Sequence, residues 1–141
     1  MKEHSLRSSS LETQTEQRSS TTGLYVTRNI LPLIARILLV AIFLWSGVNK
    51  ILHPAETQAY MAAFGMPLTW FFLPSATALE LLGGLSVLLG IYPRLGAAAL
   101  AFFTLITGFI FHSNFTDPLE QIMFMKNLTM VGGLLMVVQY G

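Results

Sequence analysis

Hydrophobic residues of this chain fall into four long runs separated by short polar breaks. The runs cover residues 30–51, 70–92, 95–112 and 119–140. Each is close to the roughly 20 helical residues that cross the hydrocarbon core of a bilayer. The pattern therefore predicts an all-α, polytopic membrane protein built as a bundle of four transmembrane helices.

Two other segments complete the predicted organisation. Residues 1–27 begin with a run rich in Ser, Thr, Gln and Glu, which we expect to be a disordered tail, followed by a membrane domain over residues 28–141. Between the first two spans, Pro54 opens and Gly65 closes a short helical pattern. At about 11 residues this helix is too short to span. We expect either a helix lying along the membrane interface or a structured loop.

Charge asymmetry predicts the orientation in the membrane. Basic residues flank the first span and the loop between the second and third spans: Lys2, Arg7, Arg18, Arg28 and Arg94. The loop between the third and fourth spans carries Asp117 and Glu120 and no basic residue. Positive residues favour the cytoplasmic side, so both termini are expected there. Lys50 and His53, on the outer side, run against this assignment.

Composition supports the membrane class and excludes several kinds of chemistry. The chain is 53% hydrophobic and only 11% charged, and its mean hydropathy is +0.62. A net charge of +1 without a basic patch argues against nucleic-acid binding. The absence of cysteine excludes disulfides and cysteine-ligated iron–sulfur clusters. The three histidines have no metal-ligand spacing, so no metal site is expected.

One carboxylate, Glu80, lies near the middle of the second span. A charge at that depth costs roughly 2.5–3.5 kcal/mol on insertion scales and usually faces a helix bundle. Helical spacing places Glu80 on the same face as Gly83 and Gly84, which favours an interior position. Counting residues from the span ends predicts Arg36 or Lys126 as its partner.

Other polar residues of the spans are expected to line the same interior. They are Arg36, Lys50, His112, Lys126 and Asn127. One interpretation is a site for a quinone or a small anion, in which Glu80 handles a proton. The other is that the buried charges only fix how the helices pack.

Several short motifs together resemble the DoxX family of small four-helix membrane proteins. They are the run from Arg36 through Ser46-Gly47 to Lys50, Glu80 with Gly83-Gly84, Pro93-Arg94, His112, and Lys126-Asn127 followed by Gly132-Gly133. The resemblance covers about residues 30–141. It implies a four-span bundle in a bacterial cytoplasmic (inner) membrane, with relatives that include a small subunit of a thiosulfate:quinone oxidoreductase.

These observations lead to one expected function and two alternatives. We expect a membrane subunit of a redox complex, at most an accessory subunit of a quinone-linked oxidoreductase, with quinone as a candidate cofactor. Its expected partners are the lipid bilayer, other membrane or redox subunits, and a second copy in a homo-oligomer. The alternatives are a structural or assembly protein and a small-solute transporter.

Overall fold

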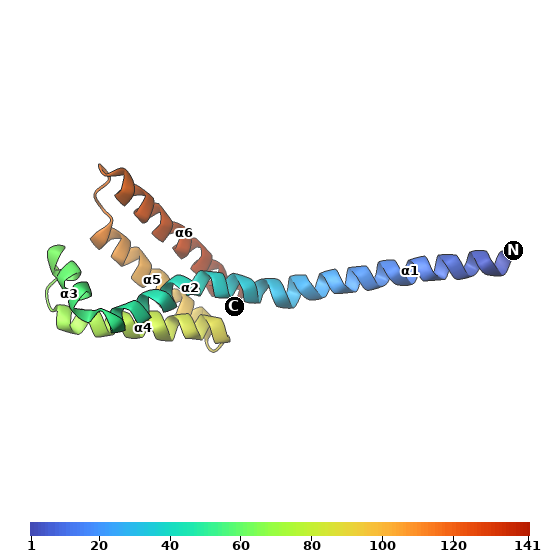
Figure 1. Cartoon of the computed structure of the whole chain (residues 1–141), viewed down its shortest axis with the longest axis horizontal. Helices are drawn as coiled ribbons and strands as arrows, with labels where there is room; N and C mark the ends of the chain where they lie inside the picture. Colours follow the sequence, from blue (N-terminus) through green and yellow to red (C-terminus); the bar gives the residue numbers. More distant parts are fainter. The chain divides into compact units, whose positions relative to one another are not determined.

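A computed structural model describes residues 1–141, and all of its regular secondary structure is helical (Figure 1). The helices are α1 (Lys2–Tyr25), the π-helix η1 (Val26–Ile30), α2 (Leu31–Leu52), α3 (Pro54–Ala63), α4 (Thr69–Leu89), α5 (Pro93–Phe111) and α6 (Pro118–Tyr140). Four helical stretches are long and apolar enough to cross a membrane. The expected all-α, four-span architecture with a short helix between the first two spans is confirmed.

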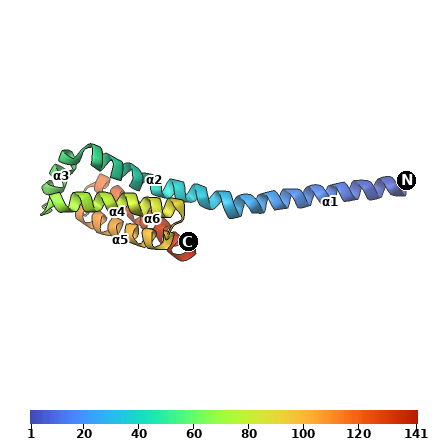
Figure 2. The ribbon, with the colours of Figure 1, turned by 90° about the horizontal axis from the view of Figure 1, so that it is seen from below.

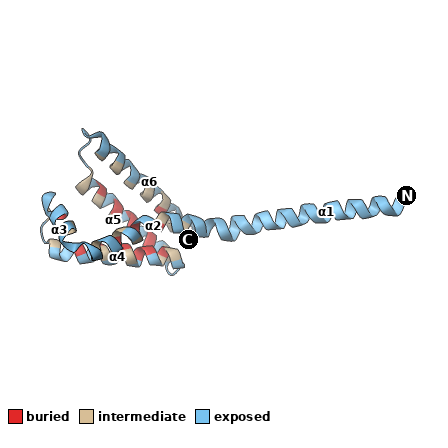
Figure 3. Ribbon diagram, in the orientation of Figure 1, coloured by how far each residue is buried: buried red, intermediate tan, exposed pale blue.

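Residues Met1–Ala35 form one unit of the chain, and Arg36–Gly141 form the other. The first unit differs from the expected disordered tail, because α1 is helical over its whole length. None of its residues is buried (Figure 3), as its polar composition implies. Its hydroxyl groups donate hydrogen bonds to backbone carbonyls one turn earlier, as Thr13 does to Ser9 and Thr21 to Gln17. The expectation of disorder rested on polar composition, whereas the structure has a continuous exposed helix over these residues.

The four spans begin and end within three residues of the runs in the sequence. The largest difference is at the end of α4, which stops at Leu89 rather than continuing to Tyr92. Gly90 there has a left-handed backbone with φ of 72°, and Tyr92 follows with φ of 48°. These two residues turn the chain tightly into α5. The Ser86 hydroxyl donates to the carbonyl of Ile91 at 2.6 Å and stabilises the turn.

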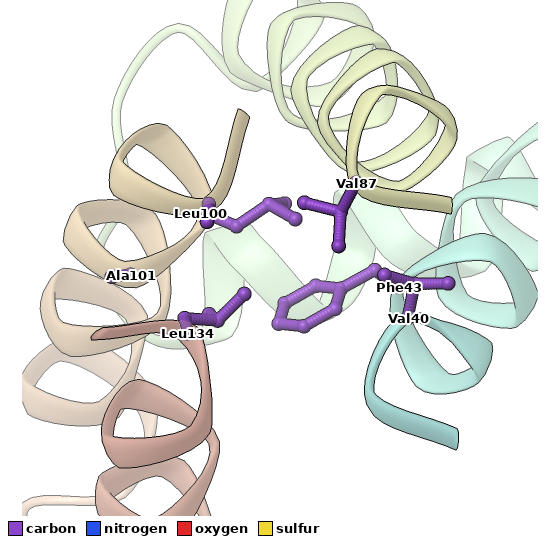
Figure 4. Packing of buried hydrophobic residues seen from close by; sticks show 7 residues of the cluster. Val40, Phe43, Val87, Leu100, Ala101 and Leu134 are labelled. Carbon is purple, nitrogen blue, oxygen red and sulfur yellow. The ribbon is translucent and has the colours of Figure 1, made fainter. Parts of the chain in front are cut away.

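Buried apolar residues of the second unit gather near this turn. They come from all four spans: Val40, Phe43, Val87, Ala97, Leu100, Ala101 and Leu134. Figure 4 shows Phe43 and Leu134 directed toward Leu100 and Val87 across the centre of the bundle. The core therefore ties the spans together at the end where α4 joins α5.

Glycines let the helices approach closely around this core. A Cβ atom added at Gly83 would lie 2.8 Å from Leu100 Cγ, and one at Gly84 would lie 2.9 Å from Leu44 Cδ2. Small residues serve the same purpose in membrane bundles generally, because packing rather than water exclusion holds the helices together. The sequence's placement of Gly83 and Gly84 at helix contacts is thus confirmed.

Away from the core, the spans diverge. Figure 1 shows α2 and α4 separating from α5 and α6 toward the end that carries α3, and Figure 2 shows α2 also moving away from α4 toward that end. The second unit is therefore closed at the α4–α5 turn and open at the other end.

A bulky residue at a glycine contact should disrupt this closure. We expect Gly83→Val to lower the free energy of unfolding by about 1–3 kcal/mol, because the added methyl groups clash with Leu100. The matched control is Gly132→Val, since a Cβ at Gly132 has no atom within 4 Å. Thermal unfolding of the purified proteins in detergent measures both. Equal melting temperatures for the two variants would contradict the packing described here.

Candidate functional site

The diverging ends of the spans enclose a pocket of about 830 Å³. Residues from α2, α3, α4, α5 and α6 line it, and most are apolar or aromatic. Its polar lining residues are Ser46, Lys50, Thr57, Tyr60, Ser75, Glu80, Thr104, Thr107, His112 and Asn127. A largely apolar cavity with a few polar groups is the usual form of a small-molecule site.

An ion pair between Lys50 and Glu80 forms the polar centre of the pocket. Lys50 Nζ lies 3.0 Å from Glu80 Oε2 and 3.2 Å from Oε1. Lys50 also donates to Ser46 Oγ at 2.6 Å, and the Ser46 hydroxyl donates to Glu80 Oε1 at 3.2 Å. The Glu80 residue is only 4% exposed. Three groups thus hold one another in a fixed arrangement on one wall of the pocket.

Helix geometry explains why these side chains meet. Ser46 and Lys50 are one turn apart on α2, so they share a face. Gly47 lies between them and brings α2 against α4, since a Cβ there would be 3.6 Å from Glu80 Cβ. Lys50 is near the end of α2, and its long side chain reaches back along the helix to the carboxylate.

Asn127 of α6 also lines the pocket. Its amide nitrogen donates to the Thr104 carbonyl at 3.3 Å, in an opening left by Gly108. The Thr104 hydroxyl in turn donates to the Leu100 carbonyl at 2.7 Å. The side-chain oxygen of Asn127 accepts no hydrogen bond within the chain, so it is available as an acceptor.

A second polar pair lies where α5 ends and α6 begins. His112 Nδ1 is 2.9 Å from Glu120 Oε2, and both side chains are partly buried. Tyr60 of α3 stacks on Phe111, with ring centroids 5.3 Å apart. Burial, and to a lesser extent the nearby Glu120 carboxylate, raise the pKa of Tyr60 above its ordinary value. Through these contacts α3 covers the wide end of the pocket.

Of the predicted site residues, the structure places Lys50, Glu80, His112 and Asn127 around the pocket. The expected pairing of Arg36 with Glu80 is wrong, because Arg36 donates to the Gly141 carbonyl instead. Glu80 of α4 lies at the same height in the bundle as Gly47 of α2. Gly47 is about 16 Å along α2 from Arg36, at roughly 1.5 Å per residue. The sequence estimate failed because it assumed that all spans begin at the same height.

The expected interior position of Lys126 is also wrong. Lys126 is exposed and does not line the pocket. Its helix, α6, has a single buried residue, Leu134, so most of its surface faces outward. Arg36 and Lys126 therefore add no positive charge to the pocket. The charges of Lys50 and Glu80 balance at its centre.

Sequence reasoning missed Ser46, Tyr60 and Glu120. Ser46 had a signal, since it precedes Lys50 by one helical turn. Tyr60 and Glu120 had no sequence signal. Their positions depend on how α3 folds back and on how the α5–α6 turn closes. No group of three His, Cys, Asp or Glu side chains is arranged to hold a metal ion.

Comparison with known proteins decides the family. The DoxX family model matches residues 31–113. The chain belongs to the DoxX family. It is 48% identical over 105 residues to the inner membrane protein YqjF of Escherichia coli (strain K12), covering 74% of this chain and 79% of YqjF. It is 32% identical over 116 residues to the inner membrane protein YphA of the same organism, covering 78% of this chain and 82% of YphA. No solved structure matches the chain significantly.

Removing one partner of the central ion pair should destabilise this DoxX protein. We expect Lys50→Met to cost about 3–5 kcal/mol of unfolding free energy, because Glu80 is left buried without a cation. Adding Glu80→Leu in the same chain should recover most of that loss, since no charge is then left unpaired. Melting curves of the single and double variants measure the effect. A double variant less stable than Lys50→Met would show that the pair does not act as a unit.

Proposed function

We propose that this DoxX protein is a small membrane subunit of a redox complex in a bacterial inner membrane, with both termini cytoplasmic. In this proposal the pocket binds the ring of a quinone or quinol. The observation that carries it is a charge-balanced polar centre, Lys50 with Glu80, on the wall of a large apolar pocket.

The hydrogen-bonding groups suit such a ring. Glu80 Oε2 accepts only from Lys50, so it has capacity to accept from a ligand hydroxyl. The side-chain oxygen of Asn127 is a second acceptor. In this proposal Lys50 donates to a carbonyl oxygen by exchanging one of its present bonds to Ser46 or Glu80. Groups that both donate and accept are what a ligand with interchangeable carbonyl and hydroxyl oxygens requires.

The apolar walls suit the rest of the molecule. The volume of about 830 Å³ lies in the range of roughly 300–1,000 Å³ that is typical of small-molecule sites. Ile42 is 52% exposed and Phe102 is 69% exposed, yet both line the pocket. The pocket therefore has an apolar rim on the outer surface of the spans, where a hydrocarbon tail would leave it for the lipid.

The charge balance of the pocket favours a neutral ring over a small anion as its ligand. An anion beside Glu80 would meet a carboxylate whose charge already neutralises Lys50. The expected cations Arg36 and Lys126 lie elsewhere, so no surplus positive charge compensates for the repulsion. A neutral ring avoids this cost.

A structural role is the second candidate. It is favoured by one observation: every buried polar side-chain atom already has a hydrogen-bond partner. In that case the Lys50–Glu80 pair would only hold α2 against α4.

Binding of a short-chain benzoquinol to the purified full chain tests the proposal. We expect Glu80→Gln to weaken binding at least tenfold, because the ligand hydroxyl loses an ionised acceptor. Glu56→Gln is the matched control, since Glu56 is exposed on α3 and does not line the pocket. Calorimetric titration in detergent measures the dissociation constants.

A second variant keeps the test valid where Glu80→Gln affects folding. Ala99→Phe narrows the pocket without touching the ion pair, and should also abolish binding. If the wild-type chain binds no quinol, or if both pocket variants bind as well as Glu56→Gln, the structural role stands instead.

A further inference from the structure

The outer surface of α6 has an unusual composition for a membrane helix. Exposed residues recur along it at alternating spacings of three and four, and we call them the α6 stripe: Ile122, Met125, Thr129, Gly132 and Met136. This is the heptad spacing with which one helix packs along another. The centre of the stripe is small, and a Cβ added at Gly132 would meet no atom within 4 Å. A neighbouring helix can therefore approach the α6 backbone closely.

The exposed faces of the other spans are bulkier. They carry Leu38 and Trp45 on α2, Leu82 and Leu89 on α4, and Phe102 and Phe109 on α5. Large apolar side chains are well suited to contact lipid tails. The outer face of α4 also has a small centre, at Ser75 and Ala78, but no basic residue lies on that helix. The α6 stripe combines two large apolar ends, a small and partly polar centre, and a lysine beside it.

Lys126 lies beside this stripe. It lies next to Ile122 and Met125 on the helix, at the flanking position where charges select the partner in heptad packing. It is exposed, and no acidic side chain of the chain pairs with it. Its Cα is about 12 Å along α6 from Pro118 at roughly 1.5 Å per residue. An unpaired ammonium at that depth is costly, and such groups usually find a carboxylate.

We propose that the α6 stripe is the docking surface for a transmembrane helix of a different protein, and that this helix carries an Asp or Glu opposite Lys126. The small centre of the stripe supplies close packing, and the ion pair supplies partner selection. This inference does not depend on what the pocket binds.

A second copy of the chain cannot supply the required carboxylate. The apolar runs of the spans contain two acidic residues, Glu80 and Glu120, and Glu80 is buried and paired with Lys50. Glu120, in the first turn of α6, pairs with His112. Two copies joined through parallel α6 helices would instead place the uncharged Gln121 of the other copy opposite Lys126. The charges therefore favour a different partner over a homodimer.

Synthetic helices test this directly. The full chain, labelled with an energy-transfer donor, is placed in neutral phosphatidylcholine vesicles with acceptor-labelled leucine–alanine transmembrane peptides. One peptide carries a single Glu at the depth of Lys126, and its match carries Gln. We expect the Glu peptide to associate at least tenfold more tightly. Lys126→Met should remove that preference, and Lys126→Arg should keep it.

A separate variant tests the close packing at the centre of the α6 stripe. Gly132→Ile fills the centre of the α6 stripe and should weaken association of the Glu peptide, whereas Leu105→Ile on the exposed face of α5 should not. Equal association of the Glu and Gln peptides overturns the proposal and assigns Lys126 to lipid headgroups. Energy transfer between two labelled copies of the chain, lost in Gly132→Ile, overturns it in favour of a homodimer.

Discussion

The rest of this bundle depends on the burial of one carboxylate, Glu80, at membrane depth. A charge there is tolerated only with a cation beside it, and Lys50 is the cation the chain provides. Lys50 reaches Glu80 only if α2 and α4 touch at this level, which Gly47 permits. The ion pair therefore fixes the relative height of two helices that apolar packing alone would leave free to slide.

This constraint divides the bundle into a tightly packed half and an open half. Near the α4–α5 turn, Gly83 and Gly84 bring leucine side chains into a dense core. Beyond Glu80 the helices diverge, and the space between them becomes the pocket. In water such a gap would collapse, because burying apolar surface is favourable there. Within lipid that driving force is missing, so an apolar cavity persists and remains available to an apolar ligand.

The sequence predicted more of the helices than of the contacts between them. Run lengths located all four spans, because crossing the bilayer imposes a minimum length. Helical spacing turned Glu80 inward correctly, since Gly83 and Gly84 mark a contact face. It could not choose Lys50 over Arg36, because periodicity gives a direction around a helix and says nothing of height relative to its neighbours. The outward position of Lys126 was missed for a related reason. The polar residues of α6 do not gather on one face, so they do not indicate its rotation, which packing against α5 determines.

The two lysines that sequence reasoning placed in one site have opposite environments. Lys50 has its charge cancelled within the chain, which leaves the pocket neutral and suited to an uncharged ring. Lys126 has no such partner, and it lies beside an exposed stripe with a small centre. A cation that the fold leaves unpaired costs stability in the isolated chain and recovers it only in an assembly. In the two proposals the same residue type therefore has different roles: Lys50 belongs to a ligand site inside the bundle, and Lys126 to a partner site on its surface.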